Sequence, residues 1–244
     1  MKRVLIIGVT SRIAQETGRL FAESGARMVV TGRDVKKLSR VISDLRTRGA
    51  EHVDGMLLDA MKVEEYQRII TEAIRSLGGM DVALIAHGML PVKAEDQENA
   101  DRVLELLQVN AVSVLVLVTL LTKVMIEQRY GCIAVISSVA GDRGRASNYA
   151  YGAAKGAVSI FLEGLRMHTA RKGVSVLTVK PGIVDTPMTE HVGPWFLKAD
   201  PSRVGRRIFR AIQRKERVVY VPWYWRWISL TIRHLPGGII YRIK

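Results

Sequence analysis

The sequence predicts an α/β protein in which helices cover both faces of a doubly wound parallel β-sheet. Short apolar runs rich in Val, Ile and Leu alternate along the chain with amphipathic stretches, and this alternation is typical of repeated strand–helix–strand units. The chain has 244 residues and no Pro-, Gly- or Ser-rich linker, so it is long enough to bury one large core. We therefore expect one domain at residues 1–221 and a tail at residues 222–244. Seven strands are expected, at residues 4–7, 27–31, 53–58, 82–86, 133–137, 174–179 and 218–221.

The cysteine count and the length of the apolar runs indicate the cellular compartment of the protein and whether it spans a membrane. Cys132 is the single cysteine, so the chain can form neither an intrachain disulfide nor a cysteine-cluster zinc site, as is typical of the reducing cytoplasm. The apolar run that follows the first basic residues ends before Arg12 and is too short for a signal peptide. The longest apolar run, residues 111–122, has twelve residues, well short of the ~20 that span a bilayer. These observations predict a cytoplasmic protein without a transmembrane helix.

The positive charge is concentrated at the end of the chain. The net charge is +14, and residues 203–244 contain eleven Lys or Arg and one acid, Glu216, so this segment carries +10 and the preceding residues +4. A basic domain can bind nucleic acid. Here the basic residues are interleaved with Trp and Ile after a complete α/β domain, so we expect no nucleic-acid partner.

The first expected strand leads into a turn that can hold a phosphate group. Gly8 begins the pattern G-x-x-x-R-x-A, which ends at Ala14. A glycine at such a strand-to-helix turn lets backbone N–H groups and the positive end of the helix face a pyrophosphate. Arg12 occupies a position where a dinucleotide-binding loop has glycine, and its side chain can contact phosphate instead. The alternative is an ordinary strand–helix turn.

Three residues at later strand ends are further candidates for a dinucleotide site. Arg33 follows the second strand directly after Gly32; NAD enzymes carry an acid near this point, whereas an arginine can pair with the 2′-phosphate of NADP. Asp59 can hydrogen-bond adenine or cap a helix. His87 can line a cofactor cleft or be packed in the fold, and no metal site is indicated near it. Arg33 can equally be a solvated surface residue.

The segment at residues 97–128 is ambiguous locally. Its sequence VSVLVLVTLL, residues 112–121, is rich enough in β-branched residues to form a strand. Its length and charged flanks favour a long helix with Asn110 part-way along it.

The stretch at residues 138–155 is where we expect catalytic chemistry. Tyr151 and Lys155 are four residues apart, and Ser138 is thirteen residues before the tyrosine. Positions i and i+4 share a helix face, so the phenol and the ammonium can face one pocket. A fixed cation favours the phenolate and lowers the pKa of the phenol, which suits a proton donor or acceptor. The alternative is an exposed helical pair.

The loops after the fifth and sixth strands can border the same pocket. Arg143 and Arg145 lie between the candidate serine and tyrosine and can meet an anionic group at the pocket mouth, or they can be exposed loop residues. The turn after the sixth strand lies at the carboxyl end of the sheet, where open α/β sheets bind ligands. The segment at residues 185–197 is expected to form a mobile flap over the substrate. Its candidate contacts are His191, Trp195 and Phe196.

Together these motifs resemble the short-chain dehydrogenase/reductase family over about residues 1–220. The resemblance implies a Rossmann-type fold and an oxidoreductase that uses NADP(H), with NADPH favoured over NADH by Arg33. It also implies that Ser138 holds the substrate oxygen, Tyr151 passes the proton, and Lys155 binds the nicotinamide ribose and tunes the tyrosine. Asn110 would hold a water that links Lys155 to solvent. The implied cofactor contacts are Gly8, Thr10, Ser11, Arg12, Ile13, Arg33, Asp59, Ala60, His87, Gly88, Tyr151, Lys155, Pro181, Gly182, Ile183 and Thr186.

The chain departs from the family pattern at two motifs. Arg12 and Ala14 replace glycines of the phosphate loop, and residues 85–88 read IAHG where relatives often have NNAG. These departures bear on the geometry of the cofactor more than on the chemistry. They keep a non-catalytic NADP-binding scaffold or sensor as an alternative.

A narrower resemblance lies in two segments, GDRGRASNY at residues 141–149 and PWYWRWISLTIRHLP at residues 222–236. Both are similar to the reductases that complete decaprenylphosphoryl arabinose synthesis by reducing a 2-keto intermediate. This resemblance implies a keto-sugar substrate carried on a polyprenyl phosphate and a role in cell wall biosynthesis. A reductase of a soluble ketone or ketoacyl substrate is the alternative.

The sequence of the tail suggests a contact with a membrane. Three of the four tryptophans lie within five residues of the tail, and a helix drawn there has a narrow polar stripe of Arg226, Ser229 and Arg233. A wide apolar face edged by basic residues suits an anionic membrane surface, which would hold the protein at the inner face of the cell membrane; the alternative is a helix that folds back on the protein.

The helices at residues 97–128 and 151–171 carry more apolar surface than one sheet face needs, so we expect a homodimer or homotetramer.

Overall fold

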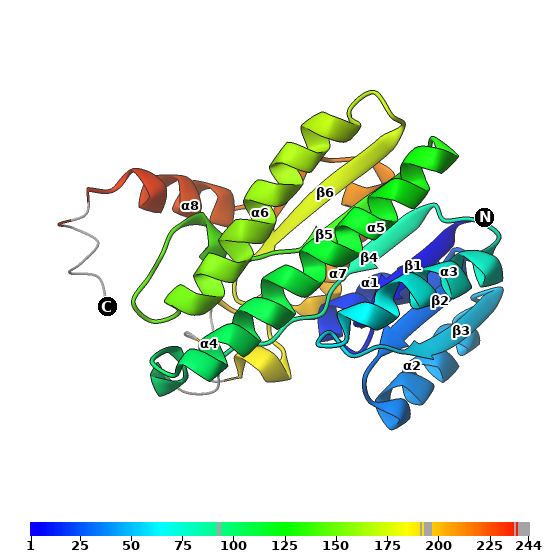
Figure 1. Ribbon diagram of the computed structural model, residues 1–244, viewed down its shortest axis with the longest axis horizontal. Helices are drawn as coiled ribbons and strands as arrows, with labels where there is room; N and C mark the ends of the chain where they lie inside the picture. The colour runs from blue at the N-terminus through cyan, green and yellow to red at the C-terminus, as the bar shows by residue number, and fades with distance from the viewer. Residues whose placement is uncertain (92–93, 191, 193–196, 237, 239–244) are drawn as a thin grey trace.

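The computed structural model describes residues 1–91, 94–190, 192, 197–236 and 238. The described residues form one parallel sheet of seven strands in the order β3-β2-β1-β4-β5-β6-β7 (Figure 1). The strands are β1 (Arg3–Ile7), β2 (Arg27–Gly32), β3 (His52–Leu57), β4 (Val82–Ile85), β5 (Gly131–Ile136), β6 (Val174–Pro181) and β7 (Val218–Val221). All seven expected strands are confirmed, with ends that differ by at most two residues.

Eight α-helices and several short helical turns connect the described strands. The α-helices are α1 (Arg12–Glu23), α2 (Val35–Thr47), α3 (Tyr66–Leu77), α4 (Ala100–Leu107), α5 (Ser113–Gln128), α6 (Tyr149–Thr169), α7 (Pro201–Gln213) and α8 (Trp225–His234). Four turns are 3-10 helical: η1 (Val63–Glu65), η2 (Ala94–Gln97), η4 (Val139–Asp142) and η5 (Pro187–Thr189). One turn, η3 (Gln108–Val112), is π-helical.

Successive residues of each central strand enter two separate cores. On β1, Val4 and Ile6 pack with the core that contains α1, α2 and α7, whereas Leu5 and Ile7 pack with the core that contains α3, α5 and α6. Because both faces of a parallel sheet are covered, its central strands are apolar at nearly every position. This explains the continuous apolar runs of the sequence.

The strand order reverses between β1 and β4, which are neighbours in the sheet although β2 and β3 lie between them in sequence. Ligands of open α/β sheets bind at such a reversal, beyond the carboxyl ends of the strands. In Figure 1 the N-terminus lies at one end of the molecule, and α4 and α8 lie at the other, where the strands end. The candidate residues should therefore gather at this second end.

The expected helix at residues 97–128 is a continuous helical run from Ala100 to Gln128, formed by α4, η3 and α5. This run is long and apolar enough to cross a bilayer by length and composition alone, although no single apolar run in the sequence suggested it. Half of its most apolar window is buried inside the fold, and Val114, Leu117 and Leu121 belong to the core. These contacts are those of a core helix.

The tail folds back on the domain through α8. Trp225 and Ser229, one turn apart, are buried at 6% and 3% exposure. The expectation that Ser229 shares an outward polar stripe with Arg226 and Arg233 is wrong, because Ser229 faces the protein while both arginines are exposed. Ile228 and Ile232 are half-buried beside this inward face, and the remaining side chains of α8 are exposed.

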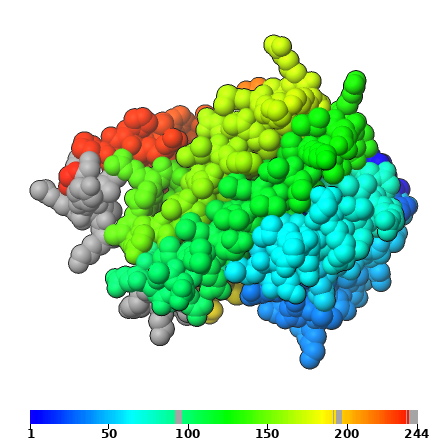
Figure 2. Space-filling model, viewed as in Figure 1, coloured from blue at the N-terminus to red at the C-terminus, as the bar shows by residue number. Residues whose placement is uncertain are grey.

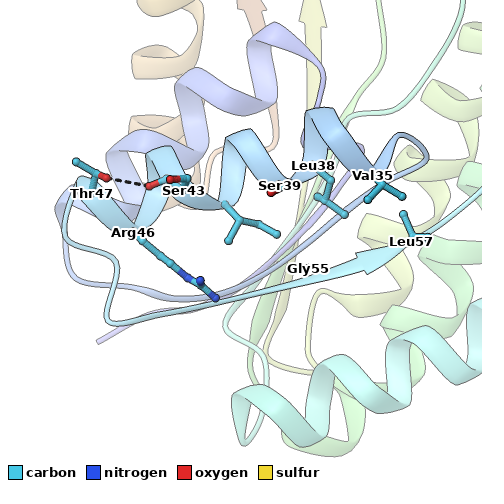
Figure 3. Close-up of a pocket in the computed structure, with 9 residues that line it drawn as sticks. Val35, Leu38, Ser39, Ser43, Arg46, Thr47, Gly55 and Leu57 are labelled. Atoms are coloured by element: carbon cyan, nitrogen blue, oxygen red, sulfur yellow. Dashed lines mark hydrogen bonds between the residues drawn. The ribbon is translucent and has the colours of Figure 1, made fainter.

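A surface hollow of about 610 Å³ lies between α2 and the edge strand β3. Figure 3 shows Arg46 reaching from α2 toward β3, where it donates to the Val53 carbonyl oxygen at 2.7 Å. Gly55 leaves the strand without a side chain at this point, next to Ile42. The hollow is at the outer edge of the sheet, away from the reversal between β1 and β4, and contains none of the candidate residues.

Candidate active site

Tyr151 and Lys155 lie on the N-terminal half of α6. Lys155 is buried at 3% exposure, and its Nζ donates to the Ile136 carbonyl oxygen at the end of β5, at 3.1 Å. The same nitrogen is 5.8 Å from the centroid of the Tyr151 ring. Tyr151 is partly buried. The alternative of an exposed helical pair is therefore wrong.

Burial dominates the protonation of this pair. It raises the pKa of Tyr151 to about 12, while a hydrogen bond with Ser138 acts in the opposite direction. Burial also lowers the pKa of Lys155 to about 8. The expectation that Lys155 lowers the pKa of the phenol is not met in the protein alone, because the loss of solvent on burial outweighs the hydrogen bond with Ser138. At neutral pH Tyr151 thus carries its proton and Lys155 its charge.

Ser138 is brought to Tyr151 by close packing of η4 on α6. Ser138 caps η4, and its Oγ accepts a hydrogen bond from the Ala140 N–H at 3.1 Å. A Cβ atom added to Gly141 would lie 2.5 Å from the Lys155 carbonyl carbon, and one added to Gly152 would lie 3.0 Å from the Ala140 oxygen. The loop and the helix therefore touch backbone to backbone, which fixes the serine beside the tyrosine.

Ser137 is a positioning residue that the sequence analysis missed. Its side chain is buried, and its Oγ donates to the Lys155 carbonyl oxygen at 3.1 Å and lies 2.9 Å from Ser159 Oγ. It thus joins the end of β5 to the turn of α6 that carries the lysine. The available signal was the pair of serines at a strand end, of which only the second was selected.

Asn110 lies in the π-helical turn η3 and holds the loop after β4. Its Nδ2 donates to the carbonyl oxygens of Met89 and Leu106 at 2.9 and 3.0 Å, and its Oδ1 accepts from the Met89 N–H at 3.0 Å. A Cβ on Gly88 would be 2.8 Å from Asn110 Oδ1 and 3.5 Å from Lys155 Nζ. Asn110, Gly88 and Lys155 are therefore neighbours. The water-holding role of Asn110 stays a prediction.

The glycine turn after β1 presents free backbone donors. Gly8 has φ of 80°, and a Cβ there would lie 2.7 Å from the His87 nitrogen, so glycine is required. Ser11 is the N-cap of α1 but makes no side-chain capping bond, and the first turn contains no acid. Arg12 is half-exposed within the first turn of α1, 3.5 Å from Glu16. The Ser11 N–H donates to the Gly8 carbonyl oxygen at 3.0 Å and closes the turn, so the N–H groups of Thr10, Arg12 and Ile13 are those that suit a pyrophosphate.

Two charged candidates lie after the neighbouring strands. Arg33 is exposed and, within the described part of the chain, its side chain has no hydrogen-bond or ion-pair partner. The adjacent Asp34 is used to cap α2, accepting from the Lys37 N–H at 2.9 Å. Asp59 accepts from the Met61 N–H at 2.9 Å, so it closes a turn rather than capping a helix. Arg33 is thus free to bind an anion.

His87 is packed and neutral. Its Nε2 is 2.7 Å from Ser113 Oγ, while its Nδ1 is buried without a partner among the described residues. Burial lowers the pKa of His87 to about 3, and the Lys155 charge acts in the same direction. The interpretation of His87 as a packed residue is therefore right. Its Nδ1, which has no partner among the described residues, can still form a hydrogen bond with a bound ligand.

The end of β6 is covered by α8. The Gly182 N–H donates to the Val221 carbonyl oxygen at 2.9 Å, and a Cβ on Gly182 would lie 1.9 Å from Trp225 Nε1. This nitrogen is buried without a partner among the described residues. Thr186 caps η5, with its Oγ1 3.1 Å from Thr189 Oγ1. Trp225 is thus a second residue that sequence reasoning did not place at the site.

Arg143 does not lie at a pocket mouth. One of its terminal nitrogens donates to the carbonyl oxygens of Ile232, Arg233 and Leu235 at 3.0, 2.7 and 3.0 Å. These are unpaired carbonyls at the end of α8, where a cation is favourable. The expectation for Arg143 is therefore wrong: it caps the tail helix. The side chain of Arg145 has no hydrogen-bond or ion-pair partner in the described part of the chain. The expected flap residues His191, Trp195 and Phe196 lie outside the described residues.

The assembled residues fit a nicotinamide dinucleotide. The uncapped start of α1 can hold the pyrophosphate, the unpaired Arg33 can meet a 2′-phosphate, and Asp59 and Ala60 lie at the neighbouring strand end. Lys155 and Tyr151 can meet the nicotinamide ribose, beside Gly88. The turn formed by Pro181, Gly182 and Ile183 completes the same end of the sheet. Ser138 and Tyr151, which share a hydrogen bond, present two hydroxyl groups that suit a substrate carbonyl oxygen.

The chain is similar to known oxidoreductases over most of its length. The pattern of the short chain dehydrogenase family matches residues 2–196. An uncharacterized oxidoreductase of Mycobacterium tuberculosis is 33% identical over 240 residues, covering 98% of this chain and 96% of that protein. One from Streptomyces coelicolor is 29% identical over 243 residues, covering 99% and 96%. A crystal structure of a variant actinorhodin polyketide ketoreductase with NADPH has a TM-score of 0.83 and 25% identity, over 92% of this chain and 97% of that one.

The contact between η4 and α6 can be tested with two glycines of one loop. We expect Gly141→Ala to lower the free energy of unfolding by about 1–3 kcal/mol, as overpacking does, because its methyl group would meet the Lys155 backbone. Gly144→Ala is the matched control, since a Cβ there meets nothing within 4 Å, and it should change stability by less than ~0.5 kcal/mol. Urea unfolding measures both. Equal stability of the two variants would contradict the close contact.

Proposed function

The chain belongs to the short-chain dehydrogenase family, and we propose that it is an NADPH-dependent reductase that converts a ketone to a secondary alcohol. The observation that carries the proposal is the assembly of Ser138, Tyr151 and Lys155 by the packing of η4 on α6. This arrangement offers a protonated phenol, a hydroxyl and a buried cation at one end of the sheet. Such a set suits proton transfer to a carbonyl oxygen.

Each residue has one task in the proposed reaction. Ser138 donates a hydrogen bond to the substrate carbonyl oxygen and holds it near Tyr151. NADPH, when bound, supplies the hydride to the carbonyl carbon. Tyr151 gives its proton to the oxygen, so that the C=O double bond becomes a C–H and an O–H bond. Lys155, charged below a pKa of about 8, stabilises the phenolate that Tyr151 becomes.

For the substrate we propose a keto-sugar carried on a polyprenyl phosphate. This proposal rests on the resemblance of residues 141–149 and 222–236 to reductases of such sugars. Both segments meet in the structure, because Arg143 caps α8. A ketoacyl thioester is the second candidate, favoured by the likeness to a polyketide ketoreductase. For an enzyme acting on either substrate we propose a cytoplasmic location.

The substrate proposal is tested by following the absorbance of reduced nicotinamide. The protein is mixed with NADPH and a panel that contains a soluble keto-sugar, a keto-sugar on a polyprenyl phosphate, and a β-ketoacyl thioester. We expect oxidation of NADPH to be fastest with the lipid-linked sugar. Faster oxidation of NADPH with the thioester would contradict the lipid-linked sugar and assign a ketoacyl substrate instead. No oxidation with any member would favour a non-catalytic NADP-binding scaffold.

We also propose that the protein is a homodimer or homotetramer formed through α5 and α6. These helices lie side by side over one face of the sheet (Figure 1). Large apolar side chains on the outer side of α6 are exposed, Ile160 and Met167 at 73% each, and on α5 Leu120 and Val124 are half-buried. Apolar side chains that are incompletely buried on neighbouring helices are typical of a self-complementary contact.

The role of Tyr151 is tested by removing its hydroxyl group. We expect Tyr151→Phe to lower kcat by ~10²-fold or more, the scale of a positioned acid, with NADPH affinity nearly unchanged. Tyr149→Phe is the matched control on the same helix, because its hydroxyl contacts only the Gln97 carbonyl oxygen among described groups, at 2.6 Å. Steady-state kinetics and NADPH titration measure both. Near-normal turnover in Tyr151→Phe would remove the phenol from the mechanism.

The protonation of Lys155 predicts a pH dependence. Burial lowers the pKa of Lys155 to about 8, so the cation is present below that pH and lost above it. We expect kcat/KM for ketone reduction to fall as pH rises through about 8, because kcat/KM reports groups of the free enzyme. Tyr151, with its pKa raised to about 12, stays protonated over this range. A value of kcat/KM that is constant to pH 10 would contradict the assignment.

The cofactor preference is tested at Arg33. A charge-assisted hydrogen bond to the 2′-phosphate should favour NADPH over NADH by about 1.5–3 kcal/mol, or roughly 10- to 150-fold in Kd. Arg33→Ala should remove this preference, whereas Lys123→Ala, which removes an exposed charge on α5, should leave it intact. Fluorescence titration with both cofactors measures the ratio. Equal affinities in the unmutated protein would make Arg33 a surface residue only.

A further inference from the structure

The outward side of α8 and its approach carry large exposed aromatic and apolar side chains. Trp223 is 72% exposed, Trp227 59% and Leu230 47%. The inward side carries Trp225 and Ser229, which are buried against the domain. The exposed residues are therefore not needed to dock the helix. Figure 2 shows α8, in red, lying open along one end of the molecule.

Positive charge surrounds these side chains. A groove of about 680 Å³ runs between α8, β7 and α7, and its lining includes Arg217, Arg226 and Arg233. None of these guanidinium groups has an ion-pair partner in the described part of the chain. The one acid in the groove, Glu216, is held by Arg207 at 2.6 Å. The groove thus presents three uncompensated cations beside two exposed tryptophans.

The position of α8 on the domain is fixed by the segment that begins at Ser138. Arg143 donates to three carbonyl oxygens at the end of α8. The preceding residue, Asp142, pairs with Lys180 and accepts from Tyr220 Oη at 3.0 Å. The exposed face therefore has a set orientation, and only a few residues separate its anchor from the catalytic serine.

We propose that Arg217, Trp223, Arg226, Trp227, Leu230 and Arg233, which we name the α8 surface, bind the interface of an anionic bilayer. Tryptophan and arginine are both favourable at the headgroup level, and a helix with an apolar face and basic flanks lies in the membrane plane. Anionic lipids attract basic residues close to the surface. The charge and the aromatic side chains are thus explained by one partner.

Two other partners fit less well. A second copy related by a two-fold axis would bring arginines of one subunit opposite those of the other, which is repulsive. A nucleic acid would use the arginines but would leave Trp223, Trp227 and Leu230 as a protruding apolar group on a convex helix. Membrane binding does not depend on the proposed reaction. Only the delivery of a lipid-linked substrate to Ser138 rests on the proposed function.

Co-sedimentation of the full-length protein with vesicles tests the α8 surface. We expect binding to phosphatidylglycerol/phosphatidylcholine vesicles at low salt, weaker binding at high salt, and little binding to pure phosphatidylcholine. Arg217→Ala, Arg226→Ala and Arg233→Ala combined should lower the partition coefficient on the order of 10²-fold, from about one tenfold step or slightly less per charge.

The matched control removes the same charge from α2, at the opposite edge of the sheet. Lys36→Ala, Lys37→Ala and Arg40→Ala combined, all exposed residues, should leave binding within a factor of a few. Equal losses in the two triple variants would show attraction by net charge alone and overturn the proposal. It would also be overturned if the unmutated protein ignored anionic vesicles at low salt.

A measurement on the unmutated protein avoids any question of folding in the variants. Vesicles that contain phosphatidylglycerol with brominated acyl chains should quench the tryptophan fluorescence, because Trp223 and Trp227 would lie near the chains. Absence of quenching with bound vesicles would contradict aromatic insertion.

Tighter binding of the α8 surface to duplex DNA than to vesicles, or loss of a dimer in the α8 triple variant, would assign this surface to another partner. If the protein bound vesicles but oxidised no NADPH with any ketone of the panel, the α8 surface would be supported and the proposed reaction would be refuted.

Discussion

The site depends on the backbone contact between η4 and α6. Because Gly141 has no side chain, the loop that follows β5 can lie directly on the turn of α6 that carries Lys155. Ser137 strengthens this contact by donating to the carbonyl oxygen of that same lysine. Ser138 then has one available position, beside Tyr151. The side chains of Ser138, Tyr151 and Lys155, on a loop and the helix that follows it, are thus held by main-chain packing, which is less adaptable than side-chain contacts.

The same loop couples the site to the end of the chain. Asp142 lies in a buried cluster with Lys180 and Tyr220, and burial together with Asp142 raises the pKa of Tyr220 to about 12. A buried carboxylate requires such partners, because an isolated one is costly. Arg143, the next residue, donates hydrogen bonds to carbonyl oxygens at the C-terminal end of α8. The loop that carries Ser138, the edge of the sheet and the tail helix α8 are therefore joined by direct contacts.

The sequence carried enough information for the fold and for selecting Ser138, Tyr151 and Lys155, which the structure brings together, but less for the environment of these residues. Apolar runs are set by burial on both faces of the sheet, so all seven strands were found. Gly8 was found because positive φ and close approach leave only glycine. The pKa of Tyr151 was expected in the wrong direction because desolvation depends on neighbours remote in sequence. Arg143, Ser229 and Trp225 were misplaced or missed for a similar reason, since the docking of α8 joins segments about 90 residues apart.

The most direct test of the central claim follows the hydrogen that is transferred. The protein is incubated with the ketone that it reduces and with NADPH that carries deuterium at C4 of the nicotinamide, in ordinary water. The proposed reaction predicts that the label appears on the carbinol carbon of the alcohol, and that the hydroxyl hydrogen comes from solvent through Tyr151. Binding of the labelled NADPH without any transfer to a ketone of the panel would contradict it and leave a nucleotide-binding protein.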